Sequence, residues 1–342
     1  MKSRIFVTAA LVMATAAWGP AARAGDAKPF REIDERSHRA IERGLQYLDR
    51  VQGRDGSWGG GATYPTAMTA LAGLAMLGAG HTPGRGRYGK DVERAVNFLL
   101  RNQDRTGLIS TQAEGGRAMH GHGFATTFLA QACGMDAEPE RTARVRKAVQ
   151  KAVILIARTQ SPQGGWYYQP QSGMDEGSVT VTEVQGLRAA RNIGVTVPTK
   201  TIAKAVEYMK KSQNSDGSIR YSLRMGGSQG RPPLTAAGCE VFYSLGMYDA
   251  PETKKAMNKL RSDIKSGRNT GHQAYFDFYA GQAIFQAGGD DWKKFYPPMR
   301  ERILKSQQAS GSWRGSISEI YCTAIYLMLL ELPYRYLPVF QR

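Results

Sequence analysis

The sequence predicts an all-α protein in which twelve helices form an (α/α)6 toroid, a double ring of six outer and six inner helices. The first observation is a phrase, Gln-x-x-x-Gly-x-Trp, that returns along the chain. The second is that an amphipathic run precedes each copy and a strongly apolar run follows it. The third is a glycine that closes five of the apolar runs. Repetition at intervals of about 50 residues is typical of repeat architectures.

Three copies of the phrase are complete, and two carry Ile in place of Trp. The complete copies are Gln52, Gly56 and Trp58; Gln160, Gly164 and Trp166; and Gln307, Gly311 and Trp313. The partial copies are Gln103 with Gly107 and Gln213 with Gly217. We expect the Gln amide to bond backbone groups of the turn, the Gly to adopt a left-handed φ, and the Trp to be buried over the amide. The phrase is therefore interpreted as a structural staple between helices.

Amphipathic runs predict the outer helices, and runs that are apolar on nearly all sides predict the inner helices. Outer helices are expected near residues 34–51, 90–103, 140–160, 199–213, 251–265 and 295–307. Inner helices are expected near residues 65–78, 121–134, 178–193, 234–246, 275–287 and 318–331. The glycines that end five inner helices are Gly78, Gly134, Gly194, Gly246 and Gly288. The fifth hairpin keeps this glycine but lacks the Gln phrase. The aromatic tail after Leu332 should pack across one face.

The first 24 residues have the pattern of a secretory signal peptide. Lys2 and Arg4 precede an apolar stretch from residue 5 to 18, and Ala22-Arg23-Ala24 matches a small-residue cleavage site. The apolar stretch is too short to span a hydrocarbon core of ~30 Å. We therefore expect cleavage after Ala24 and a secreted or periplasmic protein. Residues 25–342 are predicted to form a single toroid domain without a membrane span.

Lys and Arg number 46 against 29 Asp and Glu, which gives a formal net charge of +17. Such a surplus favours an anionic partner, either a small molecule such as a diphosphate, an acidic polysaccharide or a lipid headgroup. The predicted export of the protein argues against nucleic acid as the anionic partner. The three cysteines form no C-x-x-C pair, so we expect buried thiols and no metal or other cofactor. The sequence indicates no particular oligomeric state.

Polar residues in the first turns of the inner helices should converge at one mouth, because these helices all begin on the same face. The candidate catalytic residues are Asp175 and His122, since a carboxylate or an imidazole can act as a general acid or base. The candidate ligand-binding residues are Arg224, Arg231, Tyr275, Asp277 and Tyr279. Arginines would hold an anionic group, and aromatic rings would line the wall. Helix capping, a hydrogen-bonded histidine and core packing are the structural interpretations of these residues.

The repeated phrase resembles the QW repeat of squalene cyclases and protein prenyltransferases, which share an α/α toroid. The resemblance covers nearly all of the chain after Ala24 and implies a central cavity for an isoprenoid. The cyclase motif D-x-D-D-T is nearest at Asp175-Glu-Gly-Ser178, which has Gly and Ser at the third and fourth positions. The zinc ligands of the prenyltransferases align with Ala237, Cys239 and Phe276, and one thiol does not make a zinc site. The family's reacting residues are therefore not carried over.

Three functions stay open at this point. The first is binding of an isoprenoid or another apolar or anionic ligand in the centre, with Arg224 and Arg231 holding a diphosphate. The second is a secreted polysaccharide lyase, because toroids of the pectate-lyase type carry similar phrases and a basic cleft suits uronate substrates. The third is a non-enzymatic scaffold of the cell envelope. A deep aromatic hole favours the first function, an open basic trough the second, and a filled centre the third.

Overall fold

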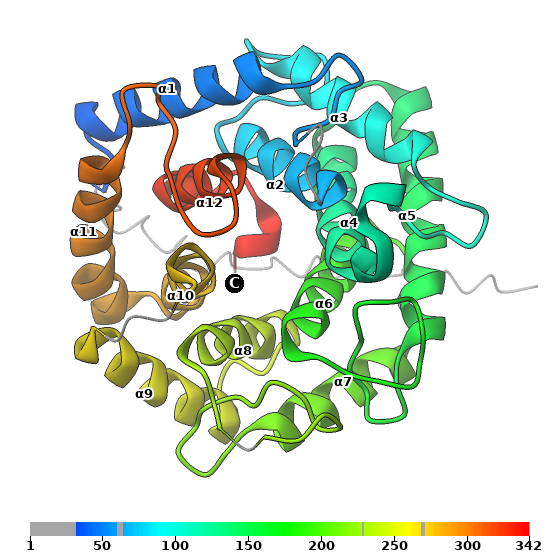
Figure 1. Cartoon of the computed structure of the whole chain (residues 1–342), viewed down its shortest axis with the longest axis vertical. Coiled ribbons are helices and arrows are strands. Elements are labelled where there is room, and N and C mark those ends of the chain that lie inside the picture. Colours follow the sequence, from blue (N-terminus) through cyan, green and yellow to red (C-terminus); the bar gives the residue numbers. More distant parts are fainter. Residues whose placement is uncertain (1–31, 60–63, 228, 268–270, 342) are drawn as a thin grey trace, which may run out of the picture.

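The computed structural model describes residues 32–59, 64–227, 229–267 and 271–341, and the predicted signal peptide lies outside them. In this part of the chain, twelve α-helices alternate between an outer and an inner ring, and no strand occurs (Figure 1). The outer helices are α1 (Glu35–Val51), α3 (Gly89–Arg101), α5 (Pro139–Thr159), α7 (Thr199–Ser212), α9 (Pro251–Ser266) and α11 (Gly289–Ser306). The inner helices are α2 (Pro65–Gly78), α4 (Ala118–Met135), α6 (Gly177–Asn192), α8 (Pro232–Ser244), α10 (Gln273–Ala287) and α12 (Glu319–Glu331). The predicted (α/α)6 toroid is confirmed.

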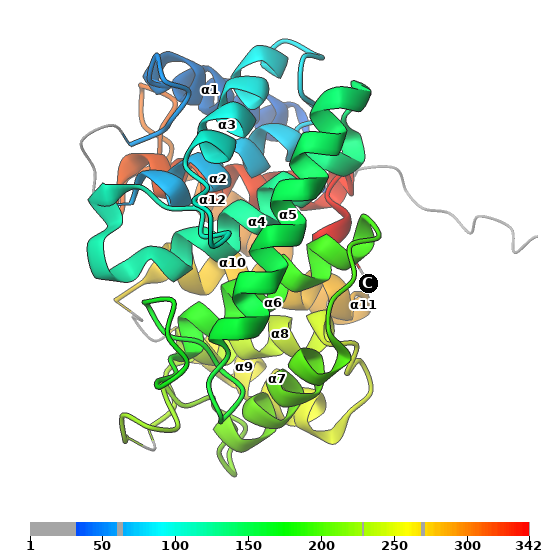
Figure 2. The same ribbon diagram turned by 90° about the vertical axis from the view of Figure 1, so that its right-hand side faces the viewer.

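The two rings differ in how much of each helix they bury. Every residue of α2 is buried, whereas α1 buries one stripe that includes Ala40, Ile41 and Leu45. Figure 2, seen from the side of α5, shows this outer helix lying over the inner ring. Burial on all sides explains why the inner helices lack a polar face, as the sequence pattern indicated.

The largest error in the predicted boundaries concerns α11, which begins at Gly289 and not near residue 295. The prediction placed the consecutive prolines Pro297 and Pro298 at the start of the helix, where proline is normally tolerated. Both prolines lie inside α11 on its exposed side. Trp292 and Tyr296, on the buried side of the same helix, stack with ring centroids 4.2 Å apart.

Five glutamine side chains, which we call the glutamine clamps, tie successive outer helices together. Gln52 Nε2 donates to the carbonyl of Gly56 in its own turn (3.0 Å) and to the carbonyl of Asp91 in α3 (2.9 Å). The other clamps join Gln103 to Ala148, Gln160 to Thr201, Gln213 to Glu252 and Gln307 to Ala40. Because Ala40 belongs to α1, the last clamp joins the two ends of the outer ring.

The glycine that follows each clamp has φ between 90° and 101° and lies against the next outer helix. At Gly164, φ is 101°, and an added Cβ would meet the carbonyl oxygen of Lys204 at 2.1 Å. The corresponding positions are Gly56, Gly107, Gly217 and Gly311, each with a backbone carbonyl at 2.3 or 2.4 Å from the same added atom. Both the backbone conformation and the lack of space therefore require glycine at these turns.

The three repeated tryptophans join the two rings. Trp166 is fully buried, its indole N–H donates to the carbonyl of Ile156 in α5 (2.7 Å), and its backbone N–H donates to the hydroxyl of Thr180 in α6 (3.0 Å). Trp58 and Trp313 make the same pair of contacts. A buried indole that satisfies its N–H adds both apolar area and a hydrogen bond to the joint.

The fifth hairpin, which lacks the Gln phrase, is joined to the sixth by an ion pair. Arg261 of α9 donates to both carboxylate oxygens of Asp291 in α11, with N–O distances of 2.9 and 2.6 Å. A bidentate guanidinium–carboxylate pair has fixed geometry. It therefore links α9 to α11 at the step of the outer ring that lacks a glutamine clamp.

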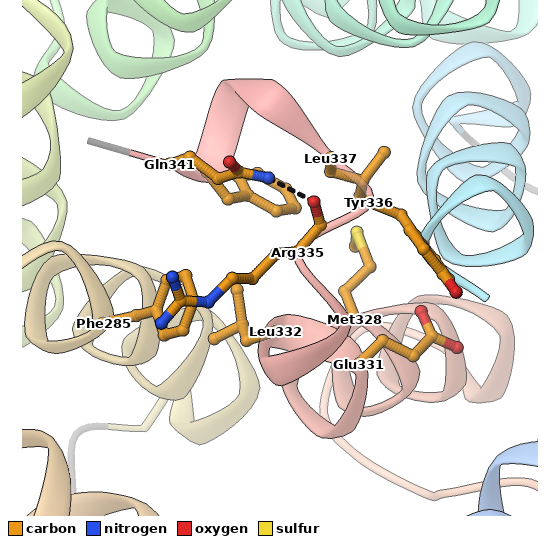
Figure 3. A pocket seen from close by; sticks show the side chains of 10 residues that line it. Phe285, Met328, Glu331, Leu332, Arg335, Tyr336, Leu337 and Gln341 are labelled. Atoms are coloured by element: carbon orange, nitrogen blue, oxygen red, sulfur yellow. Dashed lines mark hydrogen bonds between the residues drawn. The ribbon is translucent and has the colours of Figure 1, made fainter. Parts of the chain in front are cut away.

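The C-terminal segment 332–341 closes the end of the ring at which the inner helices finish (Figure 3). It forms two short 3₁₀ turns, η2 (Leu332–Tyr334) and η3 (Pro338–Phe340). Val339 donates to Gln131 of α4 (3.4 Å), and Phe340 packs edge-to-face against Phe278 of α10. A cavity of about 10 Å³ is left between this segment, α2, α10 and α12. The tail therefore plugs this end of the ring.

Glu331 lies at this cavity (Figure 3), and both of its carboxylate oxygens are buried without a hydrogen-bond partner among the described residues. Burial raises the pKa of Glu331 well above its ordinary value. The folded protein therefore keeps this proton at a pH where the unfolded chain, with a Glu pKa of about 4.3, releases it. Stability is highest below that pH and falls as the pH rises toward the folded-state pKa.

We expect Glu331→Gln to remove this pH dependence. The variant should gain up to about 1.4 kcal/mol of stability over the native protein for each pH unit above about 4.5, until Glu331 ionises in the folded state. Urea unfolding of both proteins between pH 4 and 7 measures the difference. A constant difference across this range would contradict the buried, protonated Glu331.

Candidate functional site

Asp175, the predicted catalytic carboxylate, anchors a loop. It is fully buried, and its Oδ1 accepts hydrogen bonds from Tyr208 (3.1 Å), Ser222 (2.9 Å) and the backbone N–H of Leu223 (2.7 Å). The neighbouring Glu176 caps α6 through the backbone N–H groups of residues 178 and 179. The contacts of Asp175 Oδ1 hold the loop between α7 and α8 against the start of α6, and its Oδ2 is buried without a partner among the described residues.

His122 lies between the two rings. It is fully buried, and its Nδ1 accepts the backbone N–H of Ile109 (3.1 Å), as a threonine hydroxyl does at Trp166. Burial lowers the pKa of His122 to about 4, so the ring is neutral at pH 7. Asp277 also contacts the outer ring, because it forms a 2.8 Å ion pair with Arg302 of α11. Neither side chain joins the remaining predicted residues at the mouth.

The other predicted ligand-binding residues lie nearer the mouth. Tyr275 and Tyr279 pack together with ring centroids 4.7 Å apart, and both hydroxyls are buried without a partner in the described part of the chain. Arg224 and Arg231 are exposed on the loop that leads into α8, and the guanidinium of Arg231 lies over the ring of Tyr221. The predicted mouth is thus divided into a buried tyrosine pair and an exposed basic rim.

Side chains from inner helices that are not neighbours meet inside the ring. The amide of Gln185 in α6 donates to the amide oxygen of Gln282 in α10 (2.9 Å). Ser244 donates to Glu240 in α8 (2.6 Å) next to this contact between α6 and α10. Together with the tail, this polar layer occupies space that the family resemblance reserved for an apolar ligand.

A groove of about 580 Å³ opens on the face that carries the tail, between the ends of α6 and α8. We call it the α6–α8 groove. Its apolar walls are Val184, Leu187, Val197, Ile202, Leu245 and Tyr248. Arg188, Arg191 and Ser244 supply polar groups, and Pro338 and Gln341 of the tail border one side. Its volume lies in the range of small-molecule sites, and its lining exposes nearly as much polar as apolar surface.

Arg188 is held in place by neutral acceptors. It donates to Ser244 Oγ (3.3 Å), to Gln286 Oε1 (3.3 Å) and to the backbone carbonyl of Gln341. The side-chain nitrogen of Gln286 is buried and has no acceptor among the described residues. Within the described part of the chain Arg188 forms no ion pair, although the carboxyl of Glu240, which accepts from Ser244, is close enough to interact with its charge. Arg191 adds a second, exposed guanidinium.

This groove was not predicted from the sequence. Its lining comes from α6, α7, α8 and the tail, which are far apart in the chain and meet only in the folded protein. One signal was available, since Arg188 interrupts a helix that is otherwise buried on most sides. Charged side chains in such a helix are rare unless they are paired or face a cavity.

The described residues contain no group of three or more potential ligands that could hold a metal ion. The three cysteines are buried and unpaired, and burial raises the pKa of Cys239 above its usual value. No helix among the described residues is long and apolar enough to cross a bilayer.

Comparison with known proteins shows the class of fold. The α-1,6-mannanase GH76A of Salegentibacter sp. HEL1_6 has a TM-score of 0.67 at 8% identity, covering 88% of this chain and 99% of that one. A variant of the type II terpene cyclase MstE from Scytonema, in complex with geranylgeranyl dihydroxybenzoate, has a TM-score of 0.58 at 14% identity, covering 88% and 98%. The chain is therefore an α/α toroid of the kind found in terpene cyclases and GH76 enzymes, and likeness at this identity shows the fold alone.

The chain is also similar in sequence to a known protein. Drimenyl diphosphate synthase of Streptomyces showdoensis is 26% identical over 233 residues, which are 65% of this chain and 40% of that protein. The chain thus spans less than half of the relative's length. No family model matches the sequence.

Proposed function

We propose that this terpene-cyclase-like toroid binds an isoprenoid-like amphiphile, with an apolar chain and an anionic head group, in the α6–α8 groove. The observation that carries the proposal is a 580 Å³ groove that combines apolar walls with two guanidinium groups. The likeness to a diphosphate synthase and to type II terpene cyclases supports an isoprenoid as the apolar part.

The two parts of such a ligand match two parts of the groove. Val197, Ile202 and Leu245 are partly exposed and provide surface whose burial against a hydrocarbon chain contributes roughly 25 cal/mol per Å². Arg188 is oriented before the ligand arrives, so little side-chain entropy is lost when it binds an anion. A phosphate or diphosphate accepts several hydrogen bonds from guanidinium groups.

The proposal includes binding without cyclisation. The motif that protonates the alkene in the squalene cyclases has Gly177 and Ser178 at two of its acidic positions. The remaining carboxylate, Asp175, is engaged by three donors. We therefore assign no acid to the site. A polysaccharide lyase and a non-enzymatic scaffold remain the alternative functions, and experiments can distinguish them from the proposed one.

Calorimetric titration of the protein with farnesyl diphosphate measures the binding affinity and tests the proposal. We expect Arg191→Gln to weaken binding about tenfold, which corresponds to about 1.4 kcal/mol, because one guanidinium is lost. Val197→Trp should weaken it further by filling the groove from the segment before α7. Arg105→Gln, which removes an exposed arginine from the loop after α3, is the matched control and should bind like the native protein. Absence of binding, or equal affinity in all four proteins, would overturn the proposal.

A further inference from the structure

On the face where the inner helices begin, three tyrosines and two arginines form a continuous arc, which we call the Tyr–Arg arc. Its members are Tyr64, Arg117, Tyr168, Tyr221 and Arg231. They come from the starts of α2, α4 and α8 and from the loops that precede α6 and α8. The arc therefore spans four consecutive hairpins on the side of the ring opposite to the α6–α8 groove.

Each member of the arc contacts the next one. Arg117 Nη1 donates to the hydroxyl of Tyr64 (3.2 Å), and its guanidinium carbon lies 5.5 Å from the ring centre of Tyr168. The hydroxyls of Tyr168 and Tyr221 are 2.6 Å apart. The guanidinium carbon of Arg231 lies 5.4 Å from the ring centre of Tyr221. Stacking on an aromatic face orients a guanidinium and restricts its motion.

The charges of the arc are not neutralised by its own contacts. Arg117 and Arg231 are exposed, and the partners named above are neutral tyrosines. Burial raises the pKa of Tyr168 and of Tyr221, so both hydroxyls keep their protons at neutral pH. The arc thus presents two oriented guanidinium forks, separated by a pair of hydroxyl groups. Such forks bind carboxylates with two parallel hydrogen bonds.

Polar groups without partners continue inward from the arc. The hydroxyls of Tyr275 and Tyr279 are buried and unpartnered within the described residues, and Tyr279 is fully buried. At the same face, Ser178 Oγ lies 2.9 Å from His120 Nε2, and the ring centres of His120 and Tyr168 are 5.6 Å apart. The hydroxyls of Tyr275 and Tyr279 are buried, so they lie behind the arc and are not part of its exposed surface.

We infer that the Tyr–Arg arc is a binding surface for an acidic polysaccharide whose sugar units carry carboxylates. Two forks at separate points of the arc fit a linear polymer with repeated charges, whereas a single head group would engage one of them. The flanking tyrosines offer the aromatic and hydroxyl groups that sugars contact. The formal net charge, +17 for the whole sequence and 17 − 3 = +14 after the predicted cleavage, adds long-range attraction toward a polyanion. This inference does not depend on the function proposed for the groove.

Binding to de-esterified polygalacturonate, measured by affinity electrophoresis and by calorimetry with its oligomers, tests the inference. We expect Arg117→Gln/Arg231→Gln to weaken binding at least tenfold. The control is Lys200→Gln/Lys254→Gln, which removes the same charge from exposed positions of α7 and α9 and should bind within twofold of the native protein. Circular dichroism and melting temperatures of all three proteins establish that each is folded.

Three results would overturn the inference. The first is absence of binding to any uronate polymer in low salt. The second is an equal loss in both double variants, because net charge alone would then explain the attraction. The third is binding to vesicles containing phosphatidylglycerol that is as tight as binding to polygalacturonate and depends in the same way on Arg117 and Arg231. The arc would then be a surface that binds lipids. Uncharged dextran should not bind in any case.

Discussion

Gly164→Ala should destabilise the protein by about 2–6 kcal/mol. An alanine at φ of 101° adopts a conformation that costs roughly 1–3 kcal/mol. Its Cβ would also lie 2.1 Å from the carbonyl oxygen of Lys204, so α7 must move away from the turn. Overpacking of this kind costs about 1–3 kcal/mol more. Urea unfolding monitored by circular dichroism measures the difference.

Gly173→Ala is the matched control for this change. Gly173 is exposed, and an added Cβ there meets no atom within 4 Å. Its variant should lie within about 1 kcal/mol of the native protein, on either side. If Gly164→Ala proved as stable as this control, the close approach of turn and helix would be wrong.

Gln307→Leu should cost about 2–4 kcal/mol and loosen the joint between α11 and α1. The side chain donates to the carbonyl of Gly311 (2.9 Å) and to that of Ala40 (2.8 Å), so leucine leaves two acceptors without this donor. Each lost partner of a partly buried group costs roughly 1–3 kcal/mol. Hydrogen exchange should accelerate in the facing halves of α1 and α11 more than in α5.

The adjacent glutamine provides the control. Gln308 donates only a 3.2 Å bond to Ser306, two residues away, and its amide lies at the exposed surface of the turn. Gln308→Leu should therefore change stability by less than about 0.5 kcal/mol. Equal losses in the two variants would mean that the clamp at Gln307 contributes nothing particular to closure.

The fold was predictable because the same short phrase imposes the same joint several times. The amide contact and the positive φ seen at Gln160 and Gly164 occur in all five copies, and the indole contact seen at Trp166 occurs in three. The repeated sequence therefore indicates a repeated contact. What the phrase does not encode is the partner of each clamp. Gln160 reaches Thr201 in the next outer helix, 41 residues away, and only the closed ring identifies that carbonyl.

The candidate sites were less predictable, for a physical reason. We expected polar residues of the first helical turns to face the mouth. A residue in a first turn faces the mouth, the neighbouring helix or the outer ring according to its angular position. Asp277 contacts Arg302 of the outer helix α11, and His122 accepts the backbone N–H of Ile109 in the turn after α3. The α6–α8 groove depends on the tail, whose course follows from tertiary packing alone.

Both proposed sites depend on closure of the double ring, because closure brings the tail after α12 to α6 and sets four hairpins in one arc. Electron paramagnetic resonance of nitroxides at Arg36→Cys and Glu301→Cys tests it most directly. The native side chains meet at 3.0 Å between α1 and α11, and the native cysteines are buried and should stay unlabelled in the folded protein. The account predicts strong dipolar broadening in the doubly labelled protein, compared with the summed spectra of the single labels. Spectra without broadening would show the two ends of the ring apart and would contradict it.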